Sequence, residues 1–297
     1  MPSNKGLSIV SGVILAGFIA ACASSSAIWG DPESGLILEY RMASGTMYSY
    51  EISTQTTENV EVMGQKMQVK SGSSTLFSAT GKGVKEKVQD LGITIDSMYV
   101  SVASPRGELK GDMENVIGKS FAMQLSATGK EMNLTGTEGI EYGLGPAGSR
   151  SATASFGALF QDMAGKPVKI GDTWNTQDTI RESGGGMEVM ITVNGQSRLD
   201  GVETMNGYEC ARIVSPYSGK VHGEGTQGPM NLVTDGTMKG VDTTYFAYKG
   251  GFLVESRSSG LVESVTEATG PQNMTIPSTR EMSITIRLLK GPVPIAD

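Results

Sequence analysis

The residues with catalytic or metal-binding potential are few in this sequence and lie far apart. His222 is the single histidine and has no cysteine near it, so a typical zinc site cannot form around it. No Gly-x-Ser-x-Gly nucleophile motif occurs. Acidic pairs such as Glu58 with Glu61, or Asp172 with Asp178, lack a diagnostic spacing, although catalytic carboxylates converge only in three dimensions. The sequence therefore predicts no catalytic residues and no metal site, and we expect a non-enzymatic protein.

The seventeen methionines are the other group with ligand chemistry. Thioethers favour copper(I), but the methionines are spread over many segments without a dense cluster. We expect them to fill the core, with a methionine-lined cavity for varied apolar ligands as the alternative. Gly184-Gly185-Gly186 lacks the Lys and Ser/Thr of a phosphate-binding loop. No cofactor is predicted.

The N-terminal segment has the pattern of a secretory signal peptide. Lys5 precedes a largely apolar run from Leu7 to Ala21, which is shorter than the roughly 20 residues of a transmembrane helix. A basic start, a short apolar stretch and small residues at its end are typical of such signals. We expect residues 1–21 to be removed. An ordinary signal cut after Ala21 or Ala27, or an uncleaved anchor, are the alternatives.

The end of this run, Ile19-Ala20-Ala21-Cys22, resembles the lipobox of bacterial lipoproteins. The resemblance implies cleavage between Ala21 and Cys22 and acyl chains such as palmitate on Cys22. Each buried CH₂ contributes about 0.8 kcal/mol, so several chains hold a protein on a membrane. The resemblance thus implies the bacterial cell envelope, and Ala23 after the cysteine implies the periplasmic face of the outer membrane in a Gram-negative host.

Composition places the remaining chain among β-rich globular proteins. Forty glycines suit many turns between short strands, and 38% hydrophobic residues suffice for a packed core. The net charge of −7 argues against nucleic acid, which needs a basic surface. With Cys22 acylated, Cys210 has no disulfide partner. We expect Cys210 inside a strand, facing the core.

Alternation of apolar and polar residues is the dominant pattern, and it indicates strands with one buried face. Gly64-Gln65, Asn206-Gly207 and Lys249-Gly250-Gly251 mark expected hairpin turns. Asn194-Gly195 marks a further expected strand end, because Asn-Gly accepts positive φ at both turn positions. The clearest alternating segments are Tyr48 to Ile52, Ile93 to Ile95, Met187 to Val193 and Met282 to Leu288.

One segment departs from this pattern. Phe156, Leu159, Phe160 and Met163 have helical spacing, which predicts a short amphipathic helix over 154–164 packed on a sheet. The predicted fold is mainly β, with one or more antiparallel curved sheets or two β lobes. The expected divisions are a signal peptide (1–21), a lipidated tether (22–35), an N-terminal β lobe (36–150), a helical connector (151–166) and a C-terminal β lobe (167–297), with one continuous domain over 36–297 as the alternative.

The string Pro167 to Trp174, with its Gly171-Asp172-Thr173-Trp174 turn, resembles uncharacterised secreted bacterial proteins with a GDTW turn between β-rich halves. That resemblance implies no activity. Trp174 offers a large apolar surface, so we expect it to pack on a sheet. A ligand-binding role for Trp174, Phe156 and Phe160 is the alternative interpretation.

A looser similarity is to periplasmic carriers of lipoproteins, in which a curved sheet wraps a helix. We therefore expect a lipid-anchored envelope protein that binds or scaffolds. Its partners would be the membrane through the anchor and an apolar ligand or an envelope protein. A carrier for an apolar ligand such as lipid or lipoprotein is the second hypothesis. An envelope-polymer hydrolase with dispersed carboxylates is the third.

Overall fold

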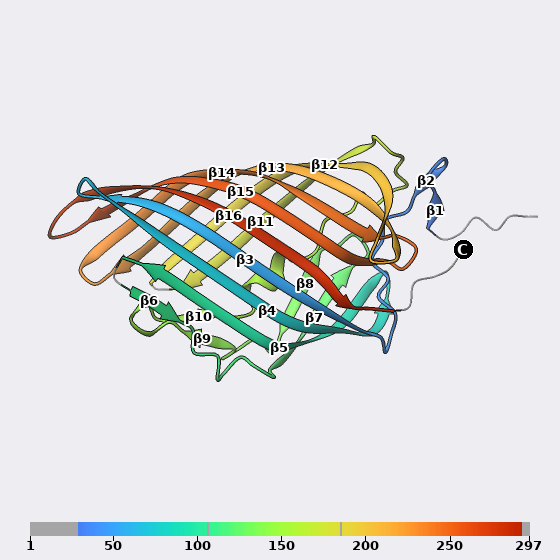
Figure 1. Cartoon of the computed structure of the whole chain (residues 1–297), viewed down its shortest axis with the longest axis horizontal. Helices are drawn as coiled ribbons and strands as arrows, with labels where there is room; N and C mark the ends of the chain where they lie inside the picture. The colour runs from blue at the N-terminus through green and yellow to red at the C-terminus, as the bar shows by residue number, and fades with distance from the viewer. Residues whose placement is uncertain (1–28, 106, 185, 293–297) are drawn as a thin grey trace, which may run out of the picture.

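A computed structural model of the chain describes residues 29–105, 107–184 and 186–292. Within these residues, fourteen strands form one large antiparallel sheet and β1 and β2 form a separate small hairpin (Figure 1). The prediction of a mainly β fold is confirmed. The strands are β1 (Gly30–Asp31), β2 (Gly35–Leu36), β3 (Met47–Val62), β4 (Gln65–Lys85), β5 (Val88–Ser104), β6 (Gly107–Lys110), β7 (Ser120–Ser126), β8 (Glu131–Thr135), β9 (Glu141–Gly143), β10 (Ser149–Ser151), β11 (Thr173–Gly184), β12 (Met187–Met205), β13 (Tyr208–Gln227), β14 (Met230–Ala247), β15 (Phe252–Thr269) and β16 (Met274–Lys290).

The strands follow the order β8-β7-β5-β4-β3-β16-β15-β14-β13-β12-β11-β10-β9, and β6 pairs with β5. Most neighbours are consecutive in the chain and form hairpins. The pair of β3 with β16 instead joins the first long strand to the last, with Ile52 opposite Ile286. Strands on both sides of residues 151–166 therefore belong to one continuous sheet.

Two-residue turns set the register of the long hairpins. Met63 and Gly64 have φ values of 52° and 77°, and Asn206 and Gly207 have φ values of 52° and 83°. Positive φ at both positions matches the right-handed twist of the flanking strands. The hairpin turn predicted at Asn206-Gly207 is confirmed.

The strand end predicted at Asn194-Gly195 is wrong. Asn194 lies inside β12 and pairs with Gln177 of β11 on one side and Ser218 of β13 on the other. Long strands flank β12 on both sides, and their continuous hydrogen bonding overrides the local turn preference. A Cβ on Gly195 would lie 2.6 Å from Thr176 Oγ1, so this glycine permits close approach between strands.

The segment between β10 and β11 runs across the concave face of the sheet (Figure 1) and contributes to the core there. Phe156 is fully buried. Its ring meets Phe77 of β4 and Phe121 of β7 edge-to-face, with centroid distances of 5.0 and 5.1 Å. Phe160 packs on Tyr40 at 5.3 Å. These aromatic pairs fix the crossing segment on the sheet.

The helix expected over 154–164 is a 3₁₀-helix confined to Ala154–Ala158. The apolar face is buried as expected, since Phe156, Leu159, Phe160 and Met163 are all in the core. The helix does not continue, because the N–H groups of Leu159 and Phe160 donate to Glu131 Oε1 at 2.7 and 2.6 Å. Those N–H groups thus donate to a side chain of β8 instead of to carbonyls of a helix.

The sheet curls until its two ends approach each other. Lys130, next to β8, reaches Asp178 of β11 with an Nζ to Oδ1 distance of 3.2 Å. An isolated bridge pairs Asp112 with Gly143 of β9. Inward-facing glycines allow strong curvature, as at Gly240, where a Cβ would meet the Tyr217 hydroxyl.

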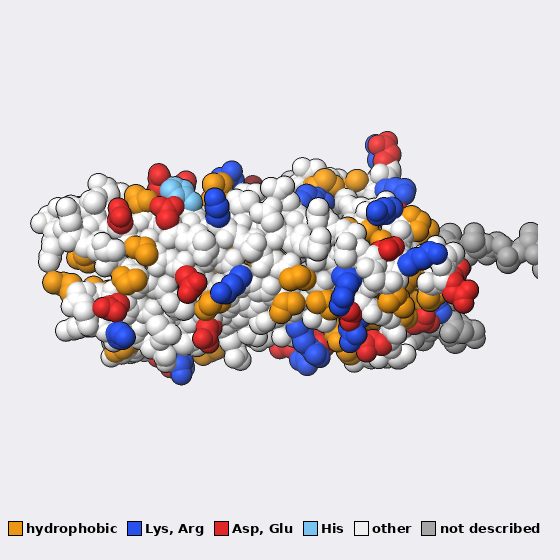
Figure 2. All heavy atoms as spheres, turned by 90° about the horizontal axis from the view of Figure 1, so that it is seen from above, with side chains coloured by type: hydrophobic (Ala, Val, Ile, Leu, Met, Phe, Trp, Pro, Cys, Tyr) orange, Lys and Arg blue, Asp and Glu red, His pale blue; other side chains and the backbone are white. Residues whose placement is uncertain are grey.

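Over the face shown in Figure 2, hydrophobic and charged side chains are interspersed among other polar groups and backbone. Within the part of the chain that the structure describes, no helix is long and apolar enough to cross a membrane.

Candidate ligand-binding cavity

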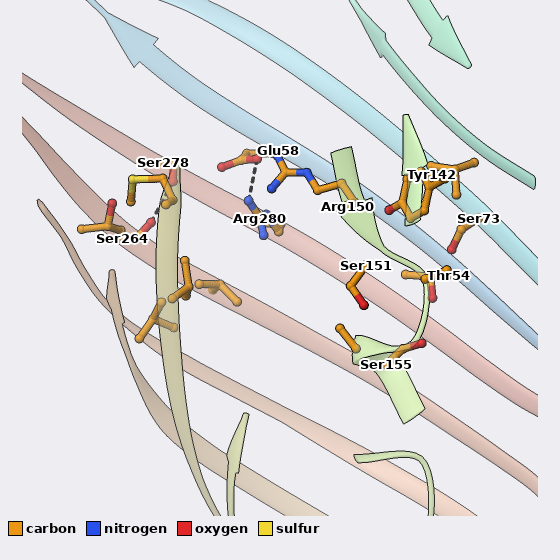
Figure 3. Close-up of a pocket in the computed structure, with 18 of the residues that line it drawn as sticks. Thr54, Glu58, Ser73, Tyr142, Arg150, Ser151, Ser155, Ser264, Ser278 and Arg280 are labelled. Atoms are coloured by element: carbon orange, nitrogen blue, oxygen red, sulfur yellow. Dashed lines mark hydrogen bonds and ion pairs between the residues drawn. The ribbon is translucent and has the colours of Figure 1, made fainter. Parts of the chain in front are cut away.

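A cavity of about 630 Å³ lies on the concave face beyond the aromatic core. Its walls come from β3, β4 and β5 on one side and from β12 to β16 on the other, and β9, β10 and the 3₁₀-helix residues contribute to it (Figure 3). Strands from both halves of the chain thus build one concave site. A volume of several hundred Å³ is within the range of small-molecule sites.

Three charged side chains line this cavity: Glu58 of β3, Arg280 of β16 and Arg150 of β10. Glu58 and Arg280 face each other in register, and Glu58 Oε2 accepts a hydrogen bond from the Arg280 guanidinium at 2.9 Å. Arg150 reaches toward this pair from the opposite wall (Figure 3). Its guanidinium forms no hydrogen bond or ion pair with any other described residue.

The uncharged lining combines hydroxyl and apolar groups. Several hydroxyls bond to one another across strands, as Ser264 does with Ser278 at 2.9 Å and Thr234 with Thr266 at 2.7 Å. Their hydrogen-bonding capacity is thus partly used within the wall. The larger aliphatic and methionine side chains of the lining are Ile52, Met98, Val100, Met187, Val189, Val221, Leu232 and Val262.

This arrangement suits binding more than hydrolysis. Glu58 supplies the carboxylate among the described lining residues, and Arg280 already neutralises it. A glycosidase-type reaction needs two convergent carboxylates. Two guanidinium groups beside an apolar wall instead favour a ligand that carries a negative charge.

Sequence reasoning missed Arg150, Arg280 and the role of Glu58. Arg280 continues the inward-facing series of Met282, Ile284 and Ile286. A charged residue at a core-facing position is uncommon, so this position could have identified Arg280 from the sequence. Arg150 lies in β10, a strand of three residues. The position of this strand opposite Glu58 depends on the path of the chain between β8 and β11, which local sequence does not indicate.

The three residues predicted as weak ligand contacts lie in the core. Phe156, Phe160 and Trp174 are 0%, 6% and 8% exposed, and none lines the cavity. The Trp174 indole N–H donates to the Asp162 carbonyl at 3.0 Å, which positions the ring. Their suggested contact with a ligand stays a prediction.

Ala21 and Cys22, the predicted cleavage and lipidation positions, lie outside the described residues. The described end of the expected tether contains β1 and the start of β2, and Leu36 pairs with Val168. Cys210 is buried in β13 as predicted, and burial raises the pKa of its thiol to about 12.

His222 lies on β13 and is not among the lining residues of the cavity. Its Nδ1 is 2.8 Å from Asp235 Oδ1 and its Nε2 is 3.3 Å from Glu224 Oε1. Hydrogen bonds to these carboxylates raise the pKa of His222. Within the described ranges, no group of three or more His, Cys, Asp or Glu side chains is arranged to hold a metal ion.

A second set of charged residues, the closing cluster, consists of Lys130, Glu131, Asp162 and Asp178. Lys130 Nζ lies 3.2 Å from Asp178 and 3.7 Å from Asp162. Burial raises the pKa of Glu131 from 4.5 to about 7, although the Phe160 and Leu159 N–H groups act in the opposite direction. The contacts of this cluster join the crossing segment to the ends of the sheet, so its role is structural.

The sequence matches no family model and no curated protein. Similar solved structures include an outer membrane channel from Pseudomonas putida, with 10% identity, a TM-score of 0.27, and 85% of this chain and 98% of that chain covered. An exported protein with a YmcC-like fold from Bacteroides fragilis has 9% identity and a TM-score of 0.25, with coverage of 85% and 99%. OccK2 from Pseudomonas aeruginosa has 11% identity and a TM-score of 0.28, with coverage of 84% and 100%. Similarities of this size carry no argument about function.

Proposed function

We propose that this chain is a lipid-anchored protein of the bacterial cell envelope that binds a small amphiphilic ligand in the cavity of its curled sheet. The observation that carries the binding role is the cavity of about 630 Å³ with charged, hydroxyl and apolar walls. The lipobox-like Ile19-Ala20-Ala21-Cys22 sequence supports the anchor.

The direction of the cavity is consistent with this role. β1 lies at one end of the molecule, and the turn between β3 and β4 lies at the other end (Figure 1). Glu58, Leu232 and Ser278, which line the cavity, lie in the parts of β3, β14 and β16 nearest that far end. An anchor that precedes β1 would leave the cavity directed away from the bilayer. The ligand would then enter from the aqueous compartment of the envelope.

A carrier of purely apolar ligands is the second candidate function. Met98, Met187 and the valines of the lining support it, because methionine adapts to varied apolar shapes. Burying the charges of Glu58, Arg150 and Arg280 against an apolar ligand would carry a desolvation cost. An amphiphilic ligand fits the cavity better.

The anchor is tested by the substitution Cys22→Ser. We expect the variant to leave the membrane fraction, since the acyl chains would have no attachment site. Fractionation with a carbonate wash measures this, and Cys210→Ser serves as the control that should stay membrane-bound. Retention of the Cys22→Ser variant would contradict lipid anchoring.

The binding role is tested with anilinonaphthalene sulfonate, an amphiphilic anion, and the full chain carrying Cys22→Ser. Thr54→Trp places an indole in the cavity, whereas Gln55→Trp places one on the exposed neighbouring position of β3. We expect equilibrium dialysis to give binding that Thr54→Trp abolishes and Gln55→Trp preserves. Equal binding by the two variants, or none by the parent protein, would overturn the proposal.

A further inference from the structure

We infer that the cavity recognises a monoanionic amphiphile, and that Arg150 together with Arg280 binds its carboxylate. The inference rests on the proposed binding function and adds the chemical class of the ligand. It depends on the juxtaposition of two guanidinium groups and a single carboxylate on the concave face.

The charged residues that line the cavity have a net positive charge. Among the described lining residues, Arg150 and Arg280 contribute +2 and Glu58 contributes −1, which leaves one uncompensated positive charge. Like charges that converge in a concave site repel each other unless an anion lies beside them. One carboxylate on a ligand would restore neutrality, whereas a dianionic phosphate would exceed it.

The guanidinium groups of Arg280 and Arg150 approach the cavity from facing walls. Arg280 is held by Glu58 at 2.9 Å, and its side chain stays 49% exposed. Its free donors remain accessible because a guanidinium has five N–H groups in a planar fork. Arg150 approaches from the facing wall without a partner among the described residues (Figure 3). A carboxylate between the two could accept hydrogen bonds from both.

The cavity also has an apolar wall. Met187, Val189, Val221, Leu232 and Val262 come from four adjacent strands, β12 to β15. A Cβ at Gly223 would lie 3.2 Å from Val189 Cγ2, so glycines between these side chains let them pack closely into one surface. An alkyl chain attached to the carboxylate would bury its CH₂ groups against this surface.

The test compares decanoate with decanol by isothermal titration calorimetry, using the full chain carrying Cys22→Ser. We expect decanoate to bind at least about tenfold more tightly, since charge-assisted hydrogen bonds to guanidinium are lost with the alcohol. Arg150→Gln should weaken decanoate binding by about tenfold and leave decanol unchanged. Arg181→Gln, an exposed arginine of β11, is the control and should change neither.

Glu58→Gln provides a test in the opposite direction. It removes the carboxylate that competes for Arg280, so we expect decanoate to bind several-fold more tightly. A purely structural role for the ion pair would instead weaken binding. Equal affinity for decanoate and decanol in all variants would overturn the carboxylate inference and leave the cavity-binding proposal standing. Absence of binding by both ligands would overturn the proposed function itself.

Discussion

Charged residues on the inner face of the sheet lie in two different environments. Glu58 and Arg280 form a partly exposed pair beside open space, whereas Glu131 is partly buried where the crossing segment meets β8. The first kind is available to a ligand. The second stabilises the fold through two backbone N–H donors at the cost of burying a carboxyl.

The partly buried Glu131 predicts an unusual pH dependence of stability. Its pKa is raised to about 7 in the folded state, so the folded protein binds the proton more tightly than the unfolded chain does. Its contribution is therefore full below the unfolded pKa, near 4.5, and is lost as the pH rises through about 7. The loss is on the order of 3 kcal/mol in the free energy of unfolding.

Glu131→Gln tests this prediction by urea denaturation at pH 5 and pH 8. The amide keeps an oxygen acceptor for the N–H groups of Leu159 and Phe160 and has no charge to bury. We expect the variant to be more stable than the parent at pH 8, with a smaller difference at pH 5. Glu138→Gln, at an exposed position, is the control. A variant that is less stable at pH 8 would show that the hydrogen bonds to the carboxylate outweigh its burial.

At the scale of elements, inward-facing glycines allow β12 to β15 to curl. Gly240 of β14 pairs with Tyr217 and Gly260. A Cβ at Gly240 would collide with the Tyr217 hydroxyl and with the Ser259 carbonyl. The curvature that creates the concave face thus depends on the absence of side chains at such positions.

Gly240→Ala is expected to lower the free energy of unfolding by about 1–3 kcal/mol, the usual cost of overpacking. Gly201→Ala is the matched control, because a Cβ there meets nothing within 4 Å. That control should change stability by less than about 0.5 kcal/mol or increase it. Chemical denaturation measures both. Equal effects of the two substitutions would contradict a packing role for Gly240.

At the scale of the whole molecule, the pairing of β3 with β16 joins the two halves of the chain. Twelve register positions, from Ser278 opposite Val60 to Lys290 opposite Ser49, link these strands. The aromatic core adds contacts between the crossing segment and β4 and β7. Apart from the small β1–β2 hairpin, the strands of both halves belong to one sheet within the described residues.

We therefore expect both halves to unfold in one cooperative transition. Pulsed hydrogen exchange with mass spectrometry at increasing urea concentration measures this for peptides from β3–β5 and from β12–β15. Their transition midpoints should coincide. Two separated midpoints would show that the halves are independent folding units in spite of the shared sheet.

Local sequence patterns were sufficient to predict the strand-forming character of the chain, the Asn206-Gly207 turn and the burial of Cys210 and of the apolar face around Phe156. These features follow from local periodicity and local φ preferences, which act over a few residues. The folded structure was needed to show that Asn194-Gly195 continues a strand, that the 3₁₀-helix stops at Ala158, and that Arg150 lines the same cavity as Glu58 and Arg280. Each of these depends on contacts between residues distant in sequence, such as neighbouring strands that complete hydrogen bonds or Glu131 accepting the Leu159 and Phe160 N–H groups. Local patterns carry no information about such partners, because only the folded chain brings them together.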